Sequence, residues 1–140
     1  MNTLTRYSAI PYTGPAPTNR QPYVPAGVAR LDARGEEIAA KLNHPAMTQE
    51  RGQDLPSFLV ERERIAQVLQ ALREHADLQF TLPLDLWGAD YPNREKRFDV
   101  MYQLYSLRNN ERVRLKVRAA EDEPVPTSVN VYKAFDWFER

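Results

Sequence analysis

Apolar and polar residues alternate with a period of two through residues 97–118. The apolar positions on one side of this pattern are Phe98, Val100, Tyr102, Leu104, Val113, Leu115, Val117 and Ala119. Successive side chains of a strand point to opposite faces, so the alternation predicts two strands that each have one apolar face. We expect these strands to form a hairpin at the centre of the fold.

Asn109 and Asn110 are the predicted turn of this hairpin. Asparagine tolerates the positive φ that a two-residue type I′ turn requires at both central positions. A turn at these residues pairs Leu104 with Leu115 and Tyr105 with Arg114. In that register the apolar faces of both strands lie on the same side of the sheet.

The opposite face of the hairpin is mixed in character. Its cations and its large apolar or aromatic residues are Arg112, Arg114, Lys116, Arg118, Met101, Tyr105 and Leu107. A face that is neither plainly core nor plainly solvent is typical of a surface covered by another protein. Two alternatives remain open: a solvated face, and a sheet that binds single-stranded nucleic acid, in which cations alternate beside aromatic side chains.

Other segments have clear helical or extended patterns. A helix is predicted over residues 61–75 from apolar residues at helical spacing, and a shorter one over 32–43. Residues 46–55 read as a polar loop, 56–60 as a short edge strand and 85–90 as a further strand. This order predicts an α+β domain with a mainly antiparallel sheet and helices packed on one face.

The N-terminal segment, residues 1–30, is rich in proline, with prolines at positions 11, 15, 17, 22 and 25 and three scattered tyrosines. This composition favours extended polyproline conformations over packed structure. We expect an extended or disordered arm over residues 1–30, followed by the α+β domain over 31–140. An arm that wraps a partner, with its tyrosines as anchors, is the alternative.

Composition excludes several functions. The 140 residues carry 19 cations and 19 acids, so the net charge gives no general argument for nucleic acid or an anionic membrane. The absence of cysteine excludes disulfides and thiolate ligation of iron–sulfur clusters or zinc. No apolar run approaches the roughly 20 residues of a membrane-spanning helix, so no direct membrane span is predicted.

Motifs for catalysis or cofactor binding are absent from the sequence. His44 and His75 have no second ligand at helical spacing, and the five glycines are dispersed rather than gathered in a phosphate loop. Asp85 and Asp90 lie five positions apart on a predicted strand, which places them on opposite faces. We therefore predict no catalytic, cofactor-binding or metal-binding residues in this chain.

Several segments resemble a known family. They are LWGADYP (86–92), RFDVMYQLYSL (97–107), RVRLKV (112–117), PTSV (126–129) and WFER (137–140). In this order they are similar to the C subunit, or thirty-kilodalton subunit family, of respiratory complex I, the proton-translocating NADH:quinone oxidoreductase. The resemblance covers about residues 56–140.

The resemblance implies a non-catalytic scaffold in the peripheral arm of complex I, on the cytoplasmic side of a bacterial membrane. Such a subunit supports electron transfer from NADH to quinone and lies beside the quinone-site and iron–sulfur subunits. It carries no flavin, cluster or metal of its own, because these belong to other subunits. The alternative function is a freestanding β-sheet module that binds nucleic acid.

Eight residues are the expected contacts with partner subunits: Arg112, Arg114, Lys116, Arg118, Tyr105, Trp137, Glu139 and Arg140. In the family the motif at the C-terminal end continues beyond the second charged residue, whereas this chain stops at Arg140. The sequence is therefore expected to be truncated there. Since little chain follows them, Phe135, Trp137 and Phe138 are expected to be poorly packed.

Overall fold

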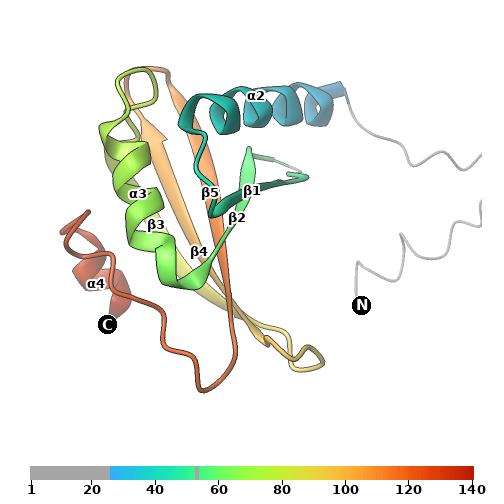
Figure 1. The fold of residues 1–140 in the computed structure, drawn as a ribbon, viewed down its shortest axis with the longest axis vertical. Coiled ribbons are helices and arrows are strands. Elements are labelled where there is room, and N and C mark those ends of the chain that lie inside the picture. Colours follow the sequence, from blue (N-terminus) through green and yellow to red (C-terminus); the bar gives the residue numbers. More distant parts are fainter. Residues whose placement is uncertain (1–25, 53) are drawn as a thin grey trace, which may run out of the picture.

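The computed structural model of the chain describes residues 26–52 and 54–140. Its elements are α2 (Ala26–Leu42), β1 (Met47–Glu50), β2 (Ser57–Val60), a 3-10 turn η1 (Arg62–Arg64), α3 (Ile65–Glu74), β3 (Leu82–Asp90), β4 (Phe98–Ser106), β5 (Glu111–Ala119) and α4 (Phe135–Glu139) (Figure 1). The strands form one five-stranded sheet in the order β1-β2-β5-β4-β3. The β4–β5 hairpin is central, as predicted, and the α+β class is confirmed.

The sheet is mainly antiparallel, with one parallel pair. β4 runs antiparallel to β3 and β5, and β1 antiparallel to β2, whereas β2 and β5 are parallel. A parallel pair needs a long connection. Between β2 and β5 that connection consists of α3, β3 and β4.

Two predictions for the first part of the sheet are wrong. Residues 47–50 form β1, although residues 46–55 read as a loop, and β1 covers β2, so residues 57–60 are not an edge. The sequence of this strand, MTQE, does not reveal it, because it is polar and only Met47 is buried. Pairing with β2 therefore determines this strand, and local sequence preference does not.

One face of the sheet carries the hydrophobic core. The helix α3 buries Ile65, Val68, Leu69 and Leu72, as its spacing predicts. Helices α2, α3 and α4 all contribute to the same core, together with the apolar faces of the strands (Figure 1). The strand residues of that core are Met47, Phe58, Val60, Tyr102, Leu104, Val113, Leu115 and Val117.

The helix α2 begins at Ala26, earlier than the predicted start near Asp32. Residues 26–30 of the predicted arm therefore lie in this helix, and residues 1–25 lie outside the described part. Gly35 leaves room for the Gln49 side chain of β1, since a Cβ there would stand 2.5 Å from Nε2 of Gln49. That amide instead donates a hydrogen bond of 2.8 Å to the backbone oxygen of Asp32.

The hairpin has the predicted faces but a different register. Tyr102 pairs with Leu115 and Tyr105 with Arg112, two residues away from the register that a turn at Asn109-Asn110 alone would give. The connection has four residues, 107–110, and of these only Asn110 has a positive φ, 49°. Four-residue loops are most often built around a type I turn, which explains the difference. A shift of two residues preserves the faces.

The strand β3 starts at Leu82, before the predicted residues 85–90. The register shifts between Pro83 and Asp85, which accommodates the proline in the ladder. Proline is tolerated there because β3 is an edge strand. The irregular pairing at this point also requires no hydrogen bond from the proline nitrogen, which carries no hydrogen. In this register Asp85 and Asp90 lie on opposite faces, as predicted.

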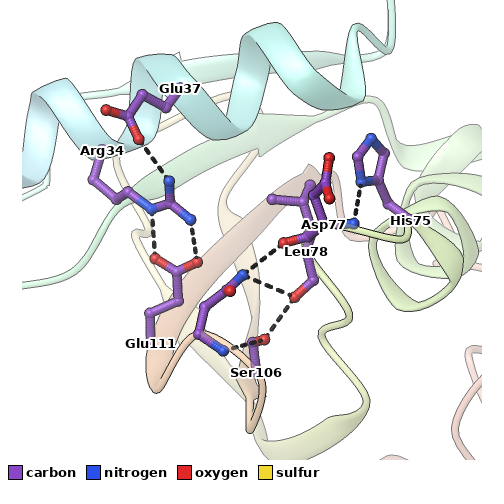
Figure 2. Close-up of polar contacts among 8 residues, drawn as sticks. Arg34, Glu37, His75, Asp77, Leu78, Ser106 and Glu111 are labelled. Atoms are coloured by element: carbon purple, nitrogen blue, oxygen red, sulfur yellow. Dashed lines mark hydrogen bonds and ion pairs between the residues drawn. The ribbon is translucent and has the colours of Figure 1, made fainter.

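Two neighbouring segments, the α3–β3 loop and α2, hold the turn of the central hairpin in place (Figure 2). The Ser106 hydroxyl donates to the backbone oxygen of Leu78 at 2.6 Å, and the Asn109 side-chain amide donates to that of Asp77 at 2.7 Å. From α2, the Arg34 guanidinium binds both carboxylate oxygens of Glu111, at 2.6 and 2.5 Å. The α3–β3 loop and α2 thus fix the same turn.

Leu115→Ala should lower the free energy of unfolding by about 2–5 kcal/mol, because Leu115 is fully buried in the middle strand. Chemical denaturation of the purified chain measures this change. Leu82→Ala is the matched control, since Leu82 is 39% exposed, and should cost less than about 1 kcal/mol. Equal losses for the two variants would show that the core is not where the structure has it.

Candidate partner-contact surface

The sheet face opposite the helices, called here the outer face, brings together side chains from all five strands. The residues that the strand register places on this face include Glu50, Leu59, Trp87, Asp99, Met101, Gln103, Tyr105, Arg112, Arg114, Lys116 and Arg118. The four predicted cations and Tyr105 are among them. The structure therefore places five of the eight predicted contact residues on one surface.

Arg114 is held at the centre of this face. Its guanidinium binds both carboxylate oxygens of Asp54, at 2.9 and 3.0 Å, and lies 5.6 Å from the centre of the Trp87 ring. The hydrogen bonds from Arg114 hold the pKa of Asp54 below its usual value. Arg114 thus ties the loop between β1 and β2 to the sheet.

Lys116 and Arg118 both pair with one acid on the edge strand β1. Glu50 of β1 accepts a hydrogen bond from Lys116 at 3.0 Å and from Arg118 at 3.3 Å. Arg118 also lies 3.9 Å from Asp99, a buried carboxylate that Arg94 binds at 2.6 Å. The sequence does not reveal Glu50 as the partner of these cations, because it does not reveal the strand β1 on which Glu50 lies.

Arg112 differs from the other three cations of the outer face. It is exposed, and the described residues give it no ion pair; its guanidinium lies 5.9 Å from the centre of the Tyr105 ring. Three of the four cations are therefore paired with acids, so the face does not offer the row of free positive charge on which nucleic-acid binding depends. This pairing argues against the nucleic-acid alternative.

The aromatic residues near the end of the chain divide into two groups. Trp137 and Phe138 are 81% and 44% exposed, as expected, whereas Phe135 is completely buried. The prediction for Phe135 is wrong because residues that precede it supply the cover: its ring makes edge-to-face contacts with Tyr102 and Tyr132, at 5.8 and 5.5 Å between centroids. Phe135 thus anchors α4 to the core.

Glu139 is bound within the chain. Its carboxylate accepts hydrogen bonds from the Thr127 hydroxyl at 2.7 Å, and from the Ser128 N–H at 2.7 Å and hydroxyl at 2.6 Å. Partial burial opposes ionisation, but the hydrogen bonds outweigh it and hold the pKa of Glu139 below its usual value of 4.5. Arg140 pairs with Asp136 at 2.9 Å and lies 5.8 Å from the Trp137 ring centre.

An open groove of about 310 Å³ lies beside α4. It is bounded on one side by the helix-covered face of β3 and β4, and on the other by the segment that follows β5. Its lining includes Leu86, Gly88, Tyr102, Pro126 and Phe138. Gly88 leaves room in this groove, because a Cβ there would meet no atom closer than 4.0 Å. The spacing of residues along the sequence does not reveal the groove, since it depends on where α4 packs.

The described residues contain no group of three or more His, Cys, Asp or Glu side chains arranged to hold a metal ion. None of the helices among the same residues is long and apolar enough to cross a membrane. His44 and His75 each accept a local backbone hydrogen bond through Nδ1, from Ala46 and Asp77 respectively. Both histidines therefore serve local turns.

Residues 58–140, from β2 to the end of the chain, match a known protein family. Its description is "Respiratory-chain NADH dehydrogenase, 30 Kd subunit". The chain belongs to this family. The match includes β3, β4 and β5 with their whole outer face, and all of β2 except Ser57.

Individual relatives have corresponding names. The NADH-quinone oxidoreductase C subunit of Rhodospirillum rubrum is 38% identical over 113 residues, which are 81% of this chain and 53% of that protein. The C subunit of a Caulobacter species is 54% identical over 77 residues, 55% of this chain and 36% of that protein. This chain thus spans about half the length, or less, of these curated relatives.

A solved structure has a similar fold. A chain in the membrane-bound sulfane sulfur reductase, an archaeal respiratory membrane complex, superposes with a TM-score of 0.65. The superposition covers 76% of this chain and 64% of that one, at 24% identity. At this identity the comparison supports the fold and nothing further.

Glu139→Gln should lower the free energy of unfolding at pH 7 and should do so less as the pH falls. A lowered folded pKa means that the ionised carboxylate stabilises the folded state above pH 4.5, and that this contribution is lost as the pH falls through the folded pKa. Denaturation of both proteins between pH 7 and about pH 3 measures the difference. Glu95→Gln, at an exposed residue, is the control, and a pH-independent difference for Glu139→Gln would contradict this account.

Proposed function

We propose that this chain is a non-catalytic structural subunit of NADH:quinone oxidoreductase. The observation that carries the proposal is the family match over residues 58–140, which spans most of the sheet and its outer face. In this role the chain lies in the peripheral arm on the cytoplasmic side of the bacterial membrane. It supports electron transfer from NADH to quinone by holding neighbouring subunits in place.

The outer face is the surface that we propose for these contacts. Trp87, Met101 and Tyr105 lie half-buried there among ion pairs, a mixture of apolar area and satisfied charge that protein interfaces share. Charges that are already paired lose less free energy on burial than isolated ones. The face is therefore better suited to cover by another protein than a strip of free cations would be.

The proposed neighbours are the quinone-site and iron–sulfur subunits. No redox centre is assigned to this chain: it has no cysteine, so it lacks the thiolates that hold most iron–sulfur clusters. In this proposal the flavin and clusters lie in other subunits, and the contribution of this chain is positional. Loss of a contact on the outer face should then reduce the amount of assembled complex, and should not change the reaction in the complexes that still form.

Met101→Glu tests this proposal, because Met101 lies in the middle of the outer face between Trp87 and Lys116. The tagged full chain is expressed in a bacterium that contains the remaining subunits, and co-purification of NADH:quinone reductase activity is measured. We expect the variant to retain its unfolding midpoint and to recover at least about tenfold less activity, as for a substitution at the centre of an interface.

Gln67→Glu introduces the same charge on the exposed face of α3 and is the control. It should co-purify as the unmodified chain does. Normal co-purification of Met101→Glu would contradict the assignment of the outer face. Failure of the unmodified chain to recover any activity would contradict the proposed function itself.

A further inference from the structure

The tip of the central hairpin, residues 105–112, displays an apolar residue beside free cations. Leu107 is 65% exposed, a large fraction for an aliphatic side chain. Arg108 and Arg112 are also exposed, and the described part of the chain provides no ion pair for either. An arginine that lacks an acid is unusual on this sheet, where the next three cations of β5 are all paired.

The backbone of the tip is fixed before any partner arrives. Ser106 and Asn109 are hydrogen-bonded to the backbone oxygens of Leu78 and Asp77, and Glu111 is bound by Arg34 (Figure 2). All of these anchors lie on the helix side of the sheet. The exposed side chains are thus presented on a rigid support, which lowers the entropy that binding has to overcome.

The Arg112 side chain is guided by an aromatic ring. The Tyr105 hydroxyl is hydrogen-bonded to Oδ1 of Asn110, which holds the ring against the turn. The Arg112 guanidinium lies 5.9 Å from the centre of that ring. Stacking on an aromatic face leaves the hydrogen-bonding edge of a guanidinium available for a carboxylate.

Two acids near the tip are already engaged. Glu111 faces the helix side and binds Arg34, and Asp54 on the outer side binds Arg114. Among the described residues, Asp77 of the adjacent α3–β3 loop forms no ion pair with Arg108 or Arg112 either, so no salt bridge neutralises the positive charge of the two arginines. A complementary surface must be acidic, with an apolar side chain to cover Leu107.

We propose that the hairpin tip docks an acidic segment of a partner subunit. In this arrangement carboxylates of the segment pair with Arg108 and Arg112, and an apolar residue of the segment packs on Leu107. The inference rests on the proposed function, and it adds a second contact at the end of the outer face together with the chemistry of its partner.

The test compares two double charge reversals in the full chain, expressed in a bacterium that contains the other subunits. Arg108→Glu/Arg112→Glu reverses the tip, and Lys41→Glu/Lys133→Glu reverses two exposed cations elsewhere for which the described residues likewise show no ion pair. The measurement is the fraction of tagged chain that sediments with NADH:quinone reductase activity, at low and at high salt. Unfolding midpoints of both variants establish that they fold.

We expect the tip reversal to lower that fraction by about tenfold or more and the control reversal to leave it unchanged. High salt should weaken association of the unmodified chain and should have little further effect on the tip reversal. If the tip reversal does not fold, Arg108→Glu alone, in the loop, serves in its place and should give a smaller loss of the same kind.

Three results would overturn the inference. Equal association and equal salt dependence of the tip reversal and the unmodified chain would show that no acidic partner lies at the tip, while the proposed function would stand. Release of the unmodified chain by nuclease treatment would identify nucleic acid as the occupant. Absence of the unmodified chain from the active fraction would remove the proposed function and this inference together.

Discussion

Strand β5 is the middle strand of the sheet, and the strict alternation of its residues determines both surfaces of the molecule. Val113, Leu115 and Val117 point toward the helices and are completely buried. Arg112, Arg114, Lys116 and Arg118 are forced onto the other side by the same backbone geometry. No residue of this strand can change sides without moving its neighbours, so core and outer face are coupled.

Four cations on a central strand require acids close by, since like charges on one face repel each other. The chain supplies these acids from elsewhere: Glu50 from β1, Asp54 from the following loop and Asp99 from β4. The short edge strand β1 thus has an electrostatic role as well as a pairing role. The resulting outer face is nearly balanced in charge and contains half-buried aromatic rings, whereas the arginines of the hairpin tip have no ion pair with any described residue.

The faces of the hairpin, the buried stripe of α3 and the family could be recognised from the sequence because each depends on local periodicity or on a continuous motif. The register could not, because a turn at Asn109-Asn110 and the observed four-residue loop leave the same residues on the same faces. The strand β1 could not be recognised because its polar sequence has no period-two pattern, so only its pairing with β2 defines it. The buried position of Phe135 depends on Tyr102, which is distant in the chain. For the same reason the ion pairs that balance the predicted cations could not be foreseen before the fold was known.

Oxidative footprinting would show whether another subunit covers the outer face in the complex. Trp87, Met101 and Tyr105 are all oxidisable and all partly exposed in the free chain. If this face is covered in the complex, hydroxyl-radical oxidation of the three should be several-fold slower in the assembled NADH:quinone oxidoreductase than in the isolated chain. Equal oxidation rates in the two states would contradict the account, because they would show that the outer face stays open to solvent in the complex.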